Sequence, residues 1–179
     1  EIRVGFVGCG NRGTGACKEA LSVKAPVKLV AFAPRGDRLA AADESEQIRI
    51  WTLDEDEGSN EPVRTLQAEG RVMVLSFDPT GTRLAVGCRS GDASNNLVRV
   101  WDLAGPEGAD PVALRSTTDV LFAPVAAFDP TSRLVAVTYL ESLALFPLER
   151  RGHVLHGEGN LGPDLAFTPD GRSLLGGSE

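Results

Sequence analysis

The sequence is poor in the residues that build metal centres, disulfide frameworks and membrane spans. It has two histidines and three cysteines, and Cys9, Cys17 and Cys88 form no C-x-x-C pair. An odd number of cysteines suits a reducing compartment better than a disulfide framework, so we expect a cytoplasmic protein. No stretch approaches 18 consecutive apolar residues, and the sequence therefore predicts no membrane-spanning helix and no membrane partner.

Basic residues are fewer than acidic ones. Eighteen Lys and Arg against 25 Asp and Glu give a net charge of −7. A surface of this sign repels a phosphate backbone, and the nearest approach to a basic patch is the pair Arg150-Arg151, so nucleic acid is not an expected partner. Hydrophobic residues at 42% and charged residues at 24% are typical of a globular chain. A length of 179 residues allows one ordinary domain, or one domain with a small appendage.

What the sequence has in abundance is repetition. Four segments share a Phe, a Pro two residues later and a short apolar run after that. They are FAPRGDRLAAA (32–42), FDPTGTRLAVG (77–87), FDPTSRLVAVT (128–138) and FTPDGRSLLGG (167–177). Their phenylalanines are 45, 51 and 39 residues apart, and this period suits one supersecondary unit per repeat.

The Pro of each segment lies in a predicted turn. The run Asp78-Pro79-Thr80-Gly81 places Asp, Pro and Gly at the first, second and fourth positions of a type I turn. Pro restricts φ, and Asp can bond the backbone of the turn itself. In the third copy Ser132 stands where Gly is expected, or the turn is one residue shorter. Each turn is predicted to join two antiparallel strands, as between VMVLSF and RLAVG.

Two further strands are predicted after each of the first three hairpins. The third strand is rich in the β-branched and aromatic residues that strands favour. It reads QIRIWTL (47–53), NLVRVWDL (96–103) and SLALFPL (142–148). The fourth strand is more polar and reads PVRTL (62–66), PVALR (111–115) and, more weakly, GHVLH (152–156). The repeat is therefore predicted to be four short strands in about 45 residues.

A four-stranded repeat of this length, with Val100-Trp101-Asp102-Leu103 in one copy, resembles the WD-repeat β-propeller family. Trp51-Thr52 and Phe146-Pro147 are degenerate versions of the Trp-Asp pair. The resemblance covers residues 27–179 and implies a mainly β fold, a partial propeller of about three and a half blades. The implied blades are 27–68, 72–115, 120–156 and, incomplete, 164–179.

Two features depart from the WD pattern. The family's Gly-His pair before the first strand reads Gly70-Arg71, and the Asp of the turn before the Trp strand is Asp92 or, less convincingly, Asp43. The family's His-to-Trp hydrogen-bond relay is therefore not expected. The resemblance implies a non-enzymatic scaffold whose partners are other proteins. Open strand edges of an incomplete ring would permit self-association.

A different motif lies at the start of the chain. Gly8, Gly10 and Gly13 in VGFVGCGNRGTGA fit G-x-G-x-x-G after a short apolar strand and before a predicted short helix. Glycines at these positions allow a tight turn and the close approach of a pyrophosphate to a helix N-terminus. Residues 1–31 resemble the NAD(P)-binding start of the glucose-fructose oxidoreductase and inositol dehydrogenase family. This resemblance implies a cofactor site made by Gly8, Gly10, Asn11, Arg12 and Gly13.

The second resemblance ends at about residue 31. The acidic residue expected roughly 20 residues after the motif is missing from the end of the second strand, and Asp37 lies beyond the next turn. The family's Glu-Lys-Pro segment, with its catalytic Lys, has no match. VKLVAF (27–32) fits both a Rossmann strand and a blade strand, and the residues after it favour the blade. We therefore expect residues 1–26 to form a Rossmann-like βα fragment that acts as a cap, a relic or an isolated anion loop.

The sequence offers few other candidates for chemistry. His153 and His156 are three residues apart and would face opposite ways on a strand, so no shared metal is expected. Cys9 is better interpreted as a packing residue than as a nucleophile. No catalytic or metal-binding residue is predicted, and the expected function is a WD-like interaction scaffold without a cofactor. The alternatives are an NAD(P)-dependent oxidoreductase fragment, or a chimeric or truncated chain without independent function.

Overall fold

The computed structural model describes residues 26–53, 61–89, 98–114, 125–139, 142–148, 155–158 and 165–176. Every regular element in these ranges is a β-strand, so the described part of the chain is mainly β, as predicted. Among these residues no helix has the length and apolar character that a membrane span needs. The predicted glycine loop and the rest of residues 1–25 lie outside the described residues.

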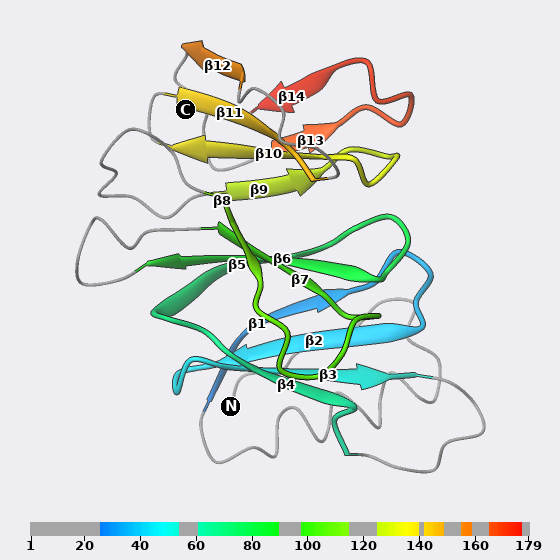
Figure 1. The fold of residues 1–179 in the computed structure, drawn as a ribbon, viewed down its shortest axis with the longest axis vertical. Coiled ribbons are helices and arrows are strands. Elements are labelled where there is room, and N and C mark those ends of the chain that lie inside the picture. Colours follow the sequence, from blue (N-terminus) through cyan, green and yellow to red (C-terminus); the bar gives the residue numbers. More distant parts are fainter. Residues whose placement is uncertain are drawn as a thin grey trace, which may run out of the picture.

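The strands form three four-stranded antiparallel sheets and one two-stranded sheet, which we call blades 1 to 4 (Figure 1). Blade 1 contains β1 (Val27–Phe32), β2 (Arg38–Asp43), β3 (Gln47–Thr52) and β4 (Arg64–Gln67). Blade 2 contains β5 (Arg71–Phe77), β6 (Arg83–Arg89), β7 (Val98–Asp102) and β8 (Val112–Leu114). Blade 3 contains β9 (Val125–Phe128), β10 (Leu134–Tyr139), β11 (Ser142–Pro147) and β12 (Leu155–Glu158), and blade 4 contains β13 (Leu165–Phe167) and β14 (Leu174–Gly176).

Each blade is a meander in which the spatial order of strands equals their order in the chain. This agrees with the four-strand repeat expected from the sequence, with one shift. The fourth strand of blade 3 runs from Leu155 to Glu158, later than the predicted 152–156, because Leu145 of β11 pairs with Leu155. The blades follow one another along the molecule, and the first strands lie next to each other: β1 contacts β5, β5 contacts β9, and β9 contacts β13 (Figure 1).

The hydrophobic core lies between blades. Side chains from β2, β3 and β4 pack against side chains from β5, β6 and β7, and Trp101 belongs to this cluster at 6% exposure. A second cluster joins Ala85 and Val98 of blade 2 to Phe128 and Val135 of blade 3. Strand β6 lies inside its sheet with blade 1 on one face and blade 3 on the other, which explains why it is buried from Leu84 to Cys88 without alternation.

The aromatic position of the third strand recurs in the same register in all three complete blades. Trp51 pairs with Leu39, Trp101 with Leu84, and Phe146 with Val135. Trp51 packs with Leu39 and Ala41 in a separate cluster, so the two tryptophans do not share one interface. Trp101 lies between blades 1 and 2.

The four Pro turns are built alike. The first residue of each turn accepts a hydrogen bond from the fourth, as in Gly81 N–H to the Asp78 carbonyl (2.9 Å) and Ser132 N–H to the Asp129 carbonyl (3.0 Å). The fourth residue has positive φ in every copy, +72° at Gly81 and +58° at Ser132. Ser132 therefore takes the glycine position and the third turn is not shortened, which decides between the two readings of the sequence.

Candidate functional site

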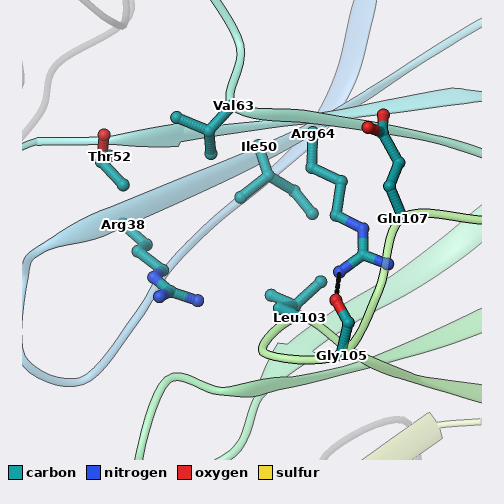
Figure 2. Close-up of a pocket in the computed structure, with 8 residues that line it drawn as sticks. All are labelled: Arg38, Ile50, Thr52, Val63, Arg64, Leu103, Gly105 and Glu107. Carbon is teal, nitrogen blue, oxygen red and sulfur yellow. Dashed lines mark hydrogen bonds between the residues drawn. The ribbon is translucent and has the colours of Figure 1, made fainter.

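A cavity of about 330 Å³ lies between blades 1 and 2, at the end of the sheets that carries the β1–β2 turn and the β7–β8 loop (Figure 2). It combines two arginines with an apolar wall and one carboxylate. Its lining residues are Arg38, Ile50, Thr52, Val63, Arg64, Leu103, Gly105 and Glu107. Because these residues come from β2, β3, the start of β4 and the β7–β8 loop, the site exists only when the two blades are packed together.

Arg64 is the most deeply buried charged group of the cavity, at 9% exposure. Alternation along β4 places it on the same inward face as Leu66. Its Nη1 donates to the carbonyl oxygens of Asp102 (3.1 Å) and Gly105 (3.2 Å), and its Nη2 donates to that of Pro106 (2.7 Å). Within the described ranges it has no carboxylate partner. The guanidinium charge is thus held by the partial negative charges of three carbonyls.

Asp102, the acidic residue of the Trp-Asp pair, shapes the loop that provides those carbonyls. Its Oδ1 accepts hydrogen bonds from the backbone N–H groups of Ala104 (2.9 Å) and Gly105 (3.2 Å). A short side chain that bonds the backbone two and three residues on is the usual way in which Asp fixes a turn. The carboxylate of Asp102 therefore acts on the loop, while the carbonyl of the same residue holds Arg64.

Arg38 is half-buried and reaches across to blade 2. Its Nη1 donates to the carbonyl oxygen of Gly81 in the β5–β6 turn (3.1 Å). Arg83 repeats this contact one blade further on, since its Nη1 donates to the carbonyl of Ser132 (2.8 Å). Only Arg38 of this pair lines the cavity, and Figure 2 shows its guanidinium directed into the space between the blades.

The remaining lining residues divide into an apolar wall and a charged edge. Ile50, Val63 and Leu103 provide the wall, and Glu107 is an exposed carboxylate at the edge. The cavity therefore offers guanidinium donors, a hydroxyl on Thr52 and an apolar surface. This combination suits the binding of a group that carries a negative charge beside a hydrophobic part.

Buried carboxylates elsewhere in the blades hold turns together. Asp43, which is buried at the end of β2, accepts bonds from Ser45 and from the backbone N–H of Gln47, and its Oδ2 pairs with Arg49 at 2.7 Å. Burial raises the pKa of Asp43, but the bonds from Ser45 and Arg49 outweigh it, so the pKa lies below its ordinary value. Asp43 thus occupies the turn before the Trp strand of blade 1, while Asp92 lies outside the described residues.

Asp78 and Asp129 act within their own Pro turns. Asp78 accepts bonds from the Thr80 hydroxyl (2.6 Å) and the Arg83 N–H (2.8 Å), and Asp129 accepts bonds from the N–H groups of Arg133 (2.7 Å) and Leu134 (2.6 Å). Burial raises the pKa of both groups, but their hydrogen bonds outweigh it, first the Thr80 hydroxyl on Asp78 and the Thr131 hydroxyl on Asp129, and the pKa of each is lowered. Both carboxylates therefore serve the fold.

The residues proposed for a cofactor from the sequence are not among those that the structure describes. Gly8, Gly10, Asn11, Arg12 and Gly13 lie outside the described residues, as do Cys9 and His153. His156 lies on β12 opposite Ala144.

Sequence reasoning did not single out Arg38, Arg64 or Glu107 as site residues. One signal was available for Arg64: alternation in PVRTLQ places it on the same face as Leu66, so a charged residue falls at a core-facing position.

Comparison with known proteins supports the repeat assignment. Residues 60–102 match the family model of the WD domain, G-beta repeat. No curated protein matches the chain. The matched stretch contains β4 of blade 1 and β5, β6 and β7 of blade 2, so one sequence repeat links two neighbouring blades. Residues 60–102 are therefore similar to a WD repeat, and the cavity lies where that stretch passes from blade 1 into blade 2.

Proposed function

We propose that this chain is a non-enzymatic scaffold that binds other proteins through its WD-like blades. Stacked repeats generally present their surfaces and loops to partners, and WD repeats are of this kind. The single observation that carries the proposal is the cavity between blades 1 and 2, in which Arg38 and Arg64 lie beside an apolar wall. Such a mixture of fixed donors and hydrophobic surface suits recognition of a peptide or a protein side chain.

Display selection tests this function without assuming which surface binds. The purified full chain is offered to libraries of random peptides, one with free and one with blocked C-termini, and the enriched peptides are synthesised and titrated by calorimetry. We expect saturable binding to the folded chain that is lost when the chain is unfolded in urea. The scaffold function would be contradicted by two results together. The selection would enrich no peptide over the unfolded chain, and chemical cross-linking would join no protein to the blades.

The cytoplasmic assignment belongs to the same proposal. Cys88 is a free, buried thiol, and burial raises its pKa to about 11. A free thiol suits a reducing compartment. The acidic charge of the chain favours a protein partner over nucleic acid. Fluorescence microscopy of the tagged chain, with fractionation, tests the location.

The second candidate function is NAD(P) binding at Gly8, Gly10, Asn11, Arg12 and Gly13, favoured by the glycine spacing of that segment. It would make the chain part of an oxidoreductase. Titration with NADH and with NADPH, followed by nicotinamide fluorescence, separates the two functions. A saturable signal that Gly10→Ala abolishes would support cofactor binding, and an unchanged signal in Gly10→Ala would count against that site.

A further inference from the structure

We propose that the cavity between blades 1 and 2 captures the C-terminal residue of a partner protein. The free carboxylate of that residue lies beside Arg38, and its apolar side chain lies against Ile50, Val63 and Leu103. This inference rests on the proposed scaffold function, because it names the partner chemistry for that surface.

Arg38 is suited to contact the carboxylate directly. Its guanidinium points into the cavity in Figure 2, and its Nη1 is bonded to the Gly81 carbonyl, which fixes the side chain in place. A guanidinium has five N–H groups arranged as a planar fork, and that fork matches the two oxygens of a carboxylate. One bond to a carbonyl therefore anchors Arg38 and leaves further donors for a ligand.

Arg64 contributes a fixed positive charge to the lining of the cavity. Its nitrogens Nη1 and Nη2 are engaged by three carbonyls, and its buried Nε has no hydrogen-bond partner among the described residues. At 9% exposure its field is poorly screened by water, so it strengthens the attraction of a neighbouring anion. Arg64 is thus a positioning charge, and Arg38 is the contact residue.

The apolar wall and the size of the cavity favour an apolar residue with a single carboxylate over a phosphate group. Among the described lining residues, two guanidinium charges and the one carboxylate of Glu107 sum to one net positive charge. A monoanion neutralises that charge. Glu107 repels any anion, and it repels a phosphate dianion more strongly than a carboxylate. A volume of about 330 Å³ is at the lower end for ligand sites, which suits a chain end more than a segment that runs through.

The test uses the full chain and two fluorescein-labelled peptides, Gly-Ser-Gly-Ser-Leu with a free C-terminus and the same peptide with a C-terminal amide. Fluorescence anisotropy gives the affinity of each. We expect the free acid to bind about tenfold or more tighter than the amide, because a charge-assisted hydrogen bond is lost in the amide. Competition with acetate and with inorganic phosphate compares the two kinds of anion, and acetate is expected to compete better.

Arg83 provides a matched control for Arg38. Both arginines bond a turn carbonyl of the next blade, but Arg83 does not line the cavity. Arg38→Gln should remove the preference for the free acid, while Arg83→Gln should lose a similar amount of thermal stability and keep the preference. Glu107→Gln should tighten binding of the free acid, since it removes a negative charge from an exposed position.

Equal binding of acid and amide, no binding of either, or an unchanged preference in Arg38→Gln would overturn the carboxylate pocket. Stronger competition by phosphate than by acetate would overturn the choice of a carboxylate. None of these results contradicts the scaffold function if display-selected peptides still bind the chain at another surface. The failure of the pocket and the failure of the proposed function are therefore separate outcomes.

Discussion

Arg64 of β4 and Asp102 of β7 join blades 1 and 2 through a bond between a guanidinium and a backbone carbonyl, with Nη1 3.1 Å from the Asp102 oxygen. The side chain of Asp102 meanwhile folds back on Ala104 and Gly105. Asp102 thus fixes the loop through its carboxylate and binds the neighbouring blade through its backbone carbonyl. Blade 2 has no arginine at the position equivalent to Arg64. Val112 of β8 pairs with Val100 there, as Arg64 of β4 pairs with Ile50.

Arg64→Met should weaken the joint between blades 1 and 2. The apolar side chain fills similar space but makes none of the three bonds to carbonyls, and the free energy of unfolding should fall by about 1–3 kcal/mol. Urea denaturation followed by Trp fluorescence measures the change. Thr65→Ala alters the exposed neighbour on β4 and should change stability by less than about 0.5 kcal/mol. Equal stability of Arg64→Met and the parent chain would show that these bonds do not hold the blades.

The glycines of the first two Pro turns should respond differently to Ala. Both have positive φ, +73° at Gly36 and +72° at Gly81, so a Cβ costs about 1–2 kcal/mol at either position. A Cβ at Gly36 meets nothing within 4 Å, whereas one at Gly81 would lie 3.3 Å from the Cβ of Ala33. Gly81→Ala should therefore lower the melting temperature more than Gly36→Ala. The reverse order would mean that contact with blade 1 does not constrain this turn.

Stability should decrease in acid because of the buried turn carboxylates. Burial raises the pKa values of Asp43, Asp78 and Asp129, but their hydrogen bonds outweigh it, and all three pKa values are lowered in the folded state. A lowered pKa stabilises the fold above the unfolded value of about 3.9, and this contribution is lost as the pH falls through the folded pKa. Denaturant titrations between pH 7 and pH 2 should show a loss that begins below about pH 5.

Asp78→Asn tests the origin of that acid sensitivity. The amide keeps an acceptor for the Arg83 N–H and has no charge to lose, so the slope of stability against pH should become shallower below about pH 5. Asp110→Asn, at an exposed aspartate, is the matched control and should leave the slope as it was. An unchanged slope in Asp78→Asn would assign the acid sensitivity to other groups.

Cys88 should resist alkylation in the folded protein. It is fully buried on β6, and burial raises its pKa to about 11, so little thiolate is present at pH 8. In a Cys9→Ser, Cys17→Ser background, its reaction with iodoacetamide at pH 8 should be about 100-fold slower in buffer than in urea. Mass spectrometry of the alkylated chain measures both rates. Similar rates in the two conditions would mean that this part of blade 2 opens readily.

The repeats could be recognised from the sequence because the signals are local. A Pro turn with a glycine at its fourth position predicts a hairpin, and alternating or β-branched runs on both sides predict its strands. The observed strand β1 coincides with the predicted run 27–32, and β2, β5 and β6 exceed their predicted runs by one or two residues. The placement of β12 was less well predicted, because the polar run at 152–156 has no strong alternation and its register is set by pairing with β11.

The similarity of the four Phe-Pro segments also concealed one difference. Arg38 and Arg83 are the fifth residues after Ala33 and Asp78, whereas Leu134 is the fifth after Asp129. Arg133 therefore falls one position earlier and does not repeat the place of the other two arginines. The hydrogen bond from the Asp129 N–H to the Leu134 carbonyl shows this shift. The Arg-Leu pair that all three segments share in sequence does not show it.

The sequence by itself determined the type of element, the turns and the four-strand period, since these follow from residue preferences over a few neighbouring positions. Only the tertiary structure decided where the charged groups meet. Arg38, Arg64 and Glu107 belong to two blades and come together because apolar side chains between the blades, Trp101 among them, are buried when the sheets pack. Burial of that interface is a non-local gain in free energy, and no short stretch of sequence records which side chains will line the space that remains.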